Sequence, residues 1–317
     1  MHEEKIALVD GQVKAVQQAV AARAVENVYF VACGGSLATL YPGKYILERE
    51  TAAVSTGAYT AAEFLNDPPA RLGEKSLVVL NSQSGGTAGH RAWRADGGVH
   101  HHARFGSGAG GGPYRLLLRR PGVPVPRGAD DLSRGIQADL RAAGCMERHG
   151  PPAGSERGHA APAGYLRRSV RGLPPRGAGV RRKIYSIAAG LDACVGYVLT
   201  NCLVMESLWK HSSPLHAGEF FHGAFEAVDD TVAVFALLGL GKTRALEERA
   251  VKFLQRKTGK LTVLDAAALD LEAYPGWLRA PVSALVLNRL AALYCDEMSY
   301  AMGHPISSRR YMGVEKY

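Results

Sequence analysis

Two polar residues in the last third of the chain could carry out acid–base chemistry together. Glu206 lies in an apolar stretch, and His222 follows it by sixteen residues. A carboxylate and an imidazole can pass protons to and from carbon, nitrogen and oxygen near neutral pH. Because Met205 and Leu208 are close neighbours of Glu206 in the sequence, we expect its side chain to be partly buried. We therefore predict that Glu206 and His222 are catalytic residues.

Other polar side chains near His222 have less specific interpretations. Glu219 could bind a substrate or cap the start of a helix, and both interpretations stay open. His216, Glu219 and His222 could together suggest a metal site, but their spacing matches no metal-binding motif. We therefore expect no metal ion, and we interpret His211 and His216 as structural residues.

Two short loops rich in glycine and hydroxyl groups could bind an anion. Residues 33–36 (Cys-Gly-Gly-Ser) and residues 81–87 (Asn-Ser-Gln-Ser-Gly-Gly-Thr) each follow a short apolar run. Backbone N–H groups and hydroxyls at the start of a helix attract negative charge. In a parallel sheet, the carboxyl ends of neighbouring strands form the ligand crevice. Together the loops predict a site where neutral donors hold one phosphate monoester.

The candidate residues lie between strands and helices that alternate along the chain. In the first half we expect a helix over 5–25, a strand over 27–32, a helix over 37–50 and a strand over 76–80. In the second half we expect strands over 184–190, 231–238 and 260–264, and helices over 193–210 and 246–257. Such alternation is typical of parallel sheets covered by helices. We predict an α/β fold of two domains, each a parallel sheet flanked by helices.

Length and composition fit two such domains in a reducing compartment. The chain has 317 residues, 47% of them hydrophobic, and no apolar run long enough to span a membrane. The N-terminus carries Glu3 and Glu4 and lacks an apolar signal core. The five cysteines form no CxxC pair and lie in apolar contexts, which favours buried thiols. We therefore expect a cytoplasmic protein that does not bind membranes.

The middle of the chain, residues 89–182, has a composition unlike either end. It contains 17 Arg, no Lys and 6 Asp or Glu, and it holds 19 of the 37 Gly and 9 of the 16 Pro. Outside it, 21 basic residues face 23 acidic ones, so the net charge of +9 comes from this segment. Because the basic charge is not spread over the predicted domains, we expect no nucleic-acid partner.

Three interpretations of residues 89–182 compete. The segment could be a disordered Arg/Gly-rich RNA-binding linker, although it has few aromatic residues and interrupts a sheet. It could be an unusual globular piece. It could also be a GC-rich gene translated in the wrong frame, which yields Arg, Gly, Pro, Ala and His with almost no Lys; we favour this hypothesis. Read one base later, the codons of His100, His101 and His102 would include two for Thr or Ile, as suits the next strand.

The two loops resemble the phosphosugar-binding signature of the sugar isomerase (SIS) domain. The resemblance rests on Ala32-Cys33-Gly34-Gly35-Ser36 and on Ser82-Gln83-Ser84-Gly85-Gly86-Thr87. In that family, the Ser, Gln, Ser and Thr of the second loop hold the sugar phosphate, helped by the first loop. The resemblance implies that the phosphate-binding residues here are Gly35, Ser36, Ser82, Gln83, Ser84 and Thr87.

The second half resembles two-domain SIS enzymes such as the isomerase half of glucosamine-6-phosphate synthase and the fructosamine-6-phosphate deglycases. In these, a helical Glu and the His of a Gly-Glu-x-x-His-Gly motif stand at the spacing of Glu206 and His222. The resemblance implies that Glu206 moves a proton between C1 and C2 of an open-chain sugar. His222 would assist ring opening or protonate the departing group. It also implies an enzyme without a cofactor that works as a homodimer, since family members often complete the site across subunits.

The C-terminal segment, residues 303–313, resembles the tail of fructoselysine- and related fructosamine-6-phosphate deglycases. His304 and Arg310 in this segment are candidate substrate-binding residues. In the synthase tail, a Lys four residues after an Arg forms a Schiff base with the ketose. With that Arg aligned on Arg310, the corresponding position holds Val314. A missing Schiff-base Lys suits a substrate that already carries its amine at C1.

The resemblance therefore implies a deglycase that converts a fructosamine 6-phosphate, such as fructoselysine 6-phosphate, to glucose 6-phosphate and an amine. An aldose–ketose isomerase, an amino-sugar-phosphate deaminase and a non-catalytic phosphosugar sensor are the alternatives. The expected organisation is the start of a first SIS domain (1–88), an out-of-frame segment (89–182) and a second SIS domain (183–317). The family's Ser/Thr-bearing segment that lines the sugar pocket is not found in 89–182, so this polypeptide would be inactive if that segment is required.

The reading-frame hypothesis predicts two compensating insertions or deletions in the source gene, near codons 89 and 182. Resequencing of the source DNA checks this directly. An uninterrupted frame across both positions would contradict the hypothesis and favour a natural Arg/Gly-rich segment, for which steeply salt-dependent RNA binding is expected instead.

Overall fold

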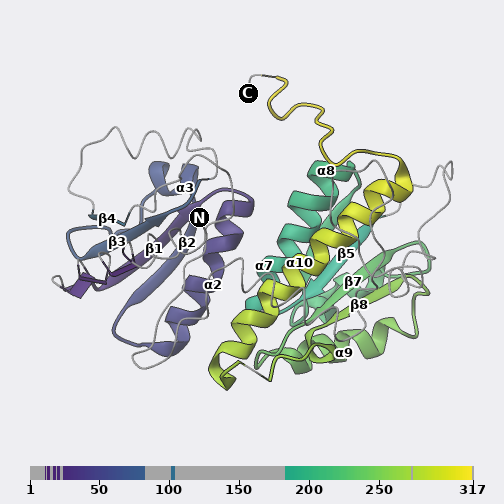
Figure 1. The fold of residues 1–317 in the computed structure, drawn as a ribbon, viewed down its shortest axis with the longest axis horizontal. Coiled ribbons are helices and arrows are strands. Elements are labelled where there is room, and N and C mark those ends of the chain that lie inside the picture. Colours follow the sequence, from purple (N-terminus) through teal and green to yellow (C-terminus); the bar gives the residue numbers. More distant parts are fainter. Residues whose placement is uncertain are drawn as a thin grey trace. The chain divides into compact units, whose positions relative to one another are not determined.

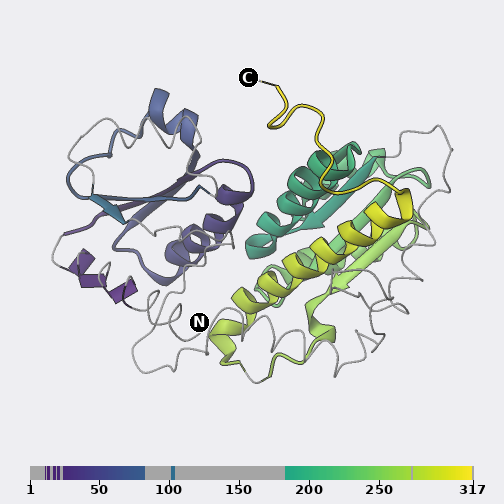
Figure 2. The same cartoon turned by 45° about the horizontal axis from the view of Figure 1, so that its top comes forward.

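The computed structural model describes residues 24–82, 101–103, 183–272 and 274–315, together with separate positions of a helix between residues 11 and 21. The chain divides into two compact units, residues 1–134 and 135–317. Each unit contains a parallel sheet with helices packed against it, as Figure 1 and Figure 2 show. The predicted α/β architecture of two parallel sheets flanked by helices is confirmed.

The first unit is built on strands in the order β2-β1-β3-β4, all of them parallel. The strands are β1 (Asn27–Ala32), β2 (Ser55–Thr60), β3 (Ser76–Leu80) and β4 (His101–Ala103). Helix α2 (Gly35–Glu50) connects β1 to β2, and α3 (Ala61–Asn66) follows β2. The strands expected over 27–32 and 76–80 are confirmed. Strand β4 lies at the place where the reading-frame hypothesis expects the next strand.

Strand β1 is buried along its whole length, because it lies inside the sheet with side chains packed on both faces. One face of the sheet is packed by Val28, Phe30, Ala32, Leu40 and Val79. The other face is packed by Tyr29, Val31, Ala61, Phe64 and Val78. This double-sided core gives the loop that follows β1 a rigid support.

The second unit has the same strand order, β6-β5-β7-β8, and is again parallel throughout the described strands. Its strands are β5 (Ile184–Ala188), β6 (Ser212–His216), β7 (Ala233–Leu238) and β8 (Leu261–Asp265). Helix α9 (Arg244–Leu254) connects β7 to β8, and α10 (Gly276–Met302) follows β8. The expected strands and the helix between β7 and β8 are present, with ends shifted by one to three residues.

The connection from β5 to β6 is a helix of mixed type. A 3-10 turn (Gly190–Asp192) leads into α7 (Ala193–Tyr197), a π-helical segment η2 (Val198–Met205) and α8 (Glu206–Leu208). We expected a regular helix over 193–210, but the structure has eight π-helical residues and ends the helix at Leu208. π-Helical turns are frequent at functional sites.

Among the described helices, Gly190–Leu208 is the one whose length and composition would allow it to cross a membrane. Half of its apolar window is buried inside the second unit, and α10 packs along it in Figure 1. The core helix of a water-soluble protein gives the same signal, so this helix does not indicate a membrane span.

Side chains of the second unit close the carboxyl edge of its sheet between β5 and β7. Glu247 of α9 accepts hydrogen bonds from the backbone N–H of Ala189 (2.9 Å) and of Gly239 (3.2 Å). Asp192 lies beside it and is 1% exposed, and Oδ1 of Asp192 has no hydrogen-bond partner. A Cβ atom at residue 239 would overlap the Asp192 carboxyl group, so glycine is required there.

The two buried carboxyl groups hold protons more tightly than exposed ones. Burial, and then the charge of Glu247, raise the pKa of Asp192 to about 8. Burial raises the pKa of Glu247 to about 7, against the effect of its two N–H donors. In the unfolded chain, these carboxyl groups have their ordinary pKa of about 4 and lose their protons above it. In the folded chain they keep their protons to a higher pH, so folding takes up protons in this range. The free energy of unfolding should fall as the pH rises from about 4 to about 8, by up to about 1.4 kcal/mol per pH unit for each proton.

Asp192→Asn should flatten this pH dependence, because an amide stays neutral at every pH in the range. The difference in unfolding free energy between about pH 5 and about pH 8 should shrink by roughly the contribution of one proton taken up on folding. Urea denaturation at both pH values, with hydrogen exchange of β5 and β7 peptides to report on the second unit, measures it. Glu226→Gln, on an exposed side chain, is the control. An unchanged pH dependence in Asp192→Asn would mean that Asp192 keeps no extra proton in the folded state.

Candidate active site

The first glycine-rich loop lies at the carboxyl end of β1 and opens helix α2. Gly34 has φ +56°, a backbone conformation that side chains disfavour, and no atom lies within 4 Å of the position of a Cβ there. Its carbonyl accepts the N–H groups of Leu37 (3.0 Å) and Ala38 (3.1 Å). The N–H groups of Gly35 and Ser36 precede these bonds at the start of the helix, where intrahelical acceptors do not exist. This end of α2 is suited to an anion.

Hydrogen bonds join the second loop to the first. Asn81, directly after β3, donates from Nδ2 to the Thr39 hydroxyl (2.7 Å) and to the Ser36 carbonyl (3.2 Å). The Thr39 hydroxyl in turn donates to the Ser36 carbonyl (2.8 Å). The loops after β1 and β3 are therefore side by side, as the parallel sheet requires. Asn81 was not among the residues predicted to bind phosphate, although its amide makes this connection.

Of the predicted phosphate-binding residues, Gly35, Ser36 and Ser82 are described and lie at this edge of the first sheet. Gln83, Ser84 and Thr87 lie outside the described residues, so their phosphate-binding roles stay predictions. Cys33, the first residue of this loop, is exposed, whereas we expected buried thiols; Cys295 is buried as expected, and Cys194 and Cys202 are partly buried. Cys33 is exposed because it follows the last residue of the buried strand.

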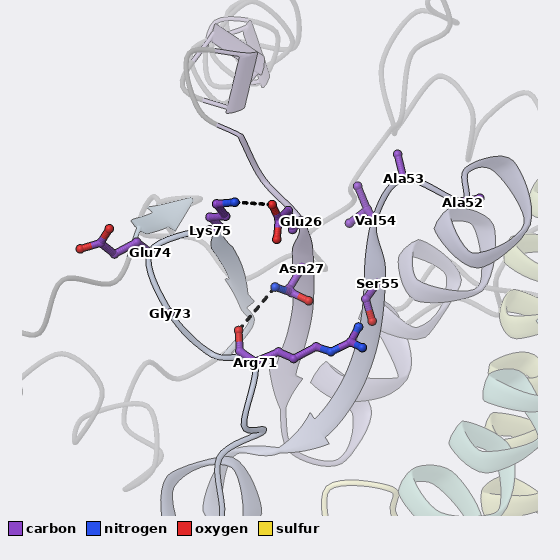
Figure 3. A pocket seen from close by; sticks show the side chains of 10 residues that line it. All are labelled: Glu26, Asn27, Ala52, Ala53, Val54, Ser55, Arg71, Gly73, Glu74 and Lys75. Atoms are coloured by element: carbon purple, nitrogen blue, oxygen red, sulfur yellow. Dashed lines mark hydrogen bonds and ion pairs between the residues drawn. The ribbon is translucent and has the colours of Figure 1, made fainter.

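A hollow of about 750 Å³ lies at the opposite edge of the first sheet. Figure 3 shows it at the beginning of β1 and β2, lined by charged side chains, with Lys75 paired to Glu26 and Arg71 extending toward Ser55. Because Asn27 and Ser55 are the first residues of their strands, this hollow is separated from the glycine-rich loops by the length of the sheet. It is not the predicted phosphate site.

Glu206 stands at the junction between the π-helical segment and α8, with its side chain 32% exposed. Its Oε1 atom is 3.4 Å from Nη2 of Arg309 in the C-terminal segment. Burial, and then the charge of Glu206, raise the pKa of the Cys202 thiol to about 11, so this neighbouring cysteine stays protonated. The carboxylate is thus half-buried, paired on one oxygen and close to solvent.

Three aromatic and basic side chains gather beside Glu206. Trp209 has φ 55°, which is unusual for a bulky residue, and it ends the helix that carries Glu206. The His304 ring packs edge-on against Trp209 at 4.5 Å between ring centroids, and its Nε2 atom is buried without a hydrogen-bond partner. The Arg310 guanidinium lies 4.4 Å from the centre of the Trp209 ring. The structure therefore brings the predicted residues Glu206, His304 and Arg310 together.

His222 lies on an exposed turn that buried aromatic residues hold in place. Phe220 is fully buried and packs edge-on against Phe221, Phe225 and Phe253 at centroid distances of 5.0, 6.4 and 5.9 Å. His222 itself is exposed, and its backbone N–H donates to the Glu219 carbonyl (2.9 Å). Gly223 follows with φ 139°, a conformation open to glycine. The phenylalanines of the Phe-Phe-His-Gly run thus anchor one side of the turn, and the His222 imidazole is exposed on the other.

Glu206 and His222 lie at opposite ends of the second sheet within one chain. The helix that carries Glu206 begins after the end of β5 and runs back to the beginning of β6, where Ser212 donates to the Thr200 carbonyl (2.8 Å). His222 instead follows the end of β6 at His216. The strand between them alone spans about 13 Å, at about 3.3 Å per residue. These two predicted residues are therefore not brought together in a single chain.

The remaining sequence-based expectations concern Glu219 and a metal site. The Glu219 side chain is exposed and makes no capping hydrogen bond to the short helix Phe220–His222, so its role as a cap is not supported. Within the described part of the chain, no group of three His, Cys, Asp or Glu side chains is arranged to hold a metal ion. Trp209 and Arg309 were missed, because their part in the site depends on contacts between segments about one hundred residues apart.

Known proteins match this chain along nearly its whole length, although no protein-family model matches it. Fructosamine deglycase FrlB of Bacillus subtilis is 34% identical over 334 residues, covering 98% of this chain and 98% of the relative. Fructoselysine 6-phosphate deglycase of Escherichia coli is 26% identical, covering 95% of this chain and 89% of the relative.

A solved structure has the same fold. It is a Bacillus subtilis protein assigned as a phosphosugar isomerase, 29% identical, with a TM-score of 0.71 and coverage of 96% of this chain and 97% of its own. The sequence identity to the Bacillus deglycase and the two parallel sheets lead to the same assignment. The chain therefore belongs to the sugar isomerase (SIS) family of phosphosugar enzymes and is a relative of the fructosamine deglycases.

Proposed function

We propose that the protein is a deglycase that converts a fructosamine 6-phosphate to glucose 6-phosphate and a free amine. The observation that carries the proposal is the 34% identity to a fructosamine deglycase over nearly the whole of both chains. Two features support it: the start of α2 with the N–H groups of Gly35 and Ser36, which is suited to an anion, and the half-buried Glu206 with His304, Arg309 and Arg310 around it. The reaction needs one carboxylate that reaches both C1 and C2 of the sugar, and it needs no oxidant or reductant.

The chemistry follows from the substrate. Glu206 removes a proton from C1 of the open-chain ketosamine, the C1=C2 double bond of an enaminol forms, and the C2 carbonyl oxygen takes a proton from water to become C2–OH. Return of the proton from Glu206 to C2, with loss of the N–H proton to water, gives an imine at C1. Water then adds to this C=N bond, and the C–N bond breaks to leave the aldehyde of glucose 6-phosphate and the amine. The amine departs with a proton, which His222 gives.

We infer that His222 reaches the substrate from a second copy of the chain. Within one chain the imidazole lies at the opposite end of the sheet from Glu206, and it is exposed on a rigid turn. An exposed, well-anchored imidazole can serve a neighbouring subunit without rearrangement. In a symmetric dimer each subunit would give Glu206 to one site and His222 to the other. We further propose that the protein is a soluble cytoplasmic enzyme.

Glu206→Gln should abolish turnover while sugar-phosphate binding is retained, because the amide has the same shape but cannot accept the C1 proton. We expect a fall in kcat of at least about a thousandfold with little change in KM or in ligand affinity. A coupled assay for glucose 6-phosphate, together with detection of the released amine, measures the reaction. Full activity in this variant would exclude the mechanism. Formation of a ketose or of ammonia in place of the amine would favour the isomerase or the deaminase.

Mixing two inactive variants tests the shared site. Glu206→Gln and His222→Asn chains, co-expressed with different tags, should complement each other if each site takes one residue from each subunit. Random pairing in a symmetric dimer should restore about a quarter of the wild-type rate. Each variant expressed alone is the control. No recovery in a mixture shown to contain mixed dimers would place both residues in a site within one chain, contrary to the fold.

A further inference from the structure

We propose that Arg309 is a positioning residue for Glu206 and that Trp209 holds the segment that carries it. The proposal rests on the proposed role of Glu206 as the base. Arg309 would act through Glu206, by fixing one carboxylate oxygen so that the other faces the sugar.

The Arg309 guanidinium is held by its own turn. Its Nη1 atom donates to the carbonyls of Ile306 (2.8 Å) and Ser308 (2.9 Å), which leaves Nη2 for Glu206 at 3.4 Å. Both side chains of the pair are about one-third exposed, at 31% and 32%, so solvent screens this pair less than a fully exposed one. A guanidinium fixed at several points loses little further freedom when it pairs with a carboxylate.

Residues before and after Arg309 in the sequence both contact Trp209. After α10 ends at Met302, His304 exchanges two hydrogen bonds with Ser299, from its N–H (3.0 Å) and to its carbonyl (2.6 Å). The His304 ring then packs on Trp209, five residues before Arg309. Arg310, one residue after it, stacks on the same indole. Arg309 therefore lies between two contacts to one side chain.

Trp209 is in turn tied to Glu206 by the helix end. It lies three residues after Glu206 and adopts a left-handed backbone conformation with φ 55°. Bulky side chains rarely adopt this conformation unless the surrounding contacts fix it. The conformation ends the helix three residues after Glu206, and the C-terminal segment packs against the indole through His304 and Arg310. The end of this helix, the Trp209 indole and the C-terminal segment thus pack together near Glu206.

This arrangement suits a base that must remove a proton from one carbon and return it to the next. In the described part of the chain, Glu206 forms an ion pair with Arg309, and it does so through Oε1. The second oxygen is left for the substrate. A carboxylate free to rotate would spend less time in the reactive geometry, and misplacement by about 1 Å can lower a rate by about a hundredfold.

Three variants test the proposal by enzyme kinetics. Arg309→Ala should lower kcat by about ten- to a hundredfold with KM changed less than about threefold, because the ligand-binding groups remain. Arg309→Lys, which keeps a cation in reach of Glu206, should recover a large part of this loss. Arg256→Ala, on an exposed arginine after α9, should match the wild type. A wild-type kcat in Arg309→Ala, or equal losses in the Ala and Lys variants with lowered thermal stability, would overturn the proposal.

Hydrogen exchange separates this proposal from the assignment of deglycase activity. If Arg309 and Glu206 hold each other, Arg309→Ala and Glu206→Gln should each speed exchange in peptides covering residues 303–315, and Arg256→Ala should not. This result is expected whatever substrate the enzyme turns over. Unchanged exchange in both variants would show that the ion pair does not fix the segment, and would overturn the proposal even if the protein proves to be a deglycase.

Discussion

A helix that connects two neighbouring parallel strands must run back along the sheet, so its two ends lie at opposite edges. The helix from Gly190 to Leu208 follows this constraint between β5 and β6. It carries Glu206 to the edge where β6 begins, while the turn with His222 follows the end of β6. The spacing of sixteen positions between them thus measures a path around a strand and not a distance between functional groups. The proposal of a site shared by two subunits follows from this constraint, as does the role of the C-terminal segment, which reaches Glu206 from the end of α10.

A second constraint is that backbone N–H groups at the carboxyl ends of parallel strands need acceptors. The two sheets, which share one strand order, meet this need differently. In the first, the loops after β1 and β3 are joined through Asn81, and the N–H groups of Gly35 and Ser36 remain at the start of a helix. In the second, Glu247 supplies a carboxylate to the N–H groups of Ala189 and Gly239. Glu247 takes the place that an anionic ligand would occupy. The N–H groups of Ala189 and Gly239 in the second unit are therefore already bonded within the protein, whereas those of Gly35 and Ser36 have no acceptor within their helix.

The sequence predicted well those parts of the fold that depend on local patterns. The apolar runs over 27–32 and 76–80 became β1 and β3 without change, since buried parallel strands read as continuous apolar runs. Edge strands β2 and β6 were missed, because Ser55–Thr60 is only partly buried and Ser212–His216 contains a proline, which edge strands tolerate. Helix α10 was also missed, although its 27 residues pack along the Glu206 helix. The roles of Trp209 and Arg309 could not be predicted from local patterns, because a left-handed tryptophan and a contact across about one hundred residues exist only in the folded chain.

The unusual middle of the sequence is best understood through the length of the chain. An inserted linker would leave about ninety residues with no counterpart in a relative, yet the match to the Bacillus deglycase covers 98% of both chains. Residues 89–182 therefore stand in the place of a segment of similar length and do not add to it. The strand β4 at His101–Ala103 pairs with β3 where a parallel sheet of this order needs its next strand. A shifted reading frame between two compensating changes keeps the length of a segment and alters its composition. A natural Arg/Gly-rich linker would have no reason to keep that length.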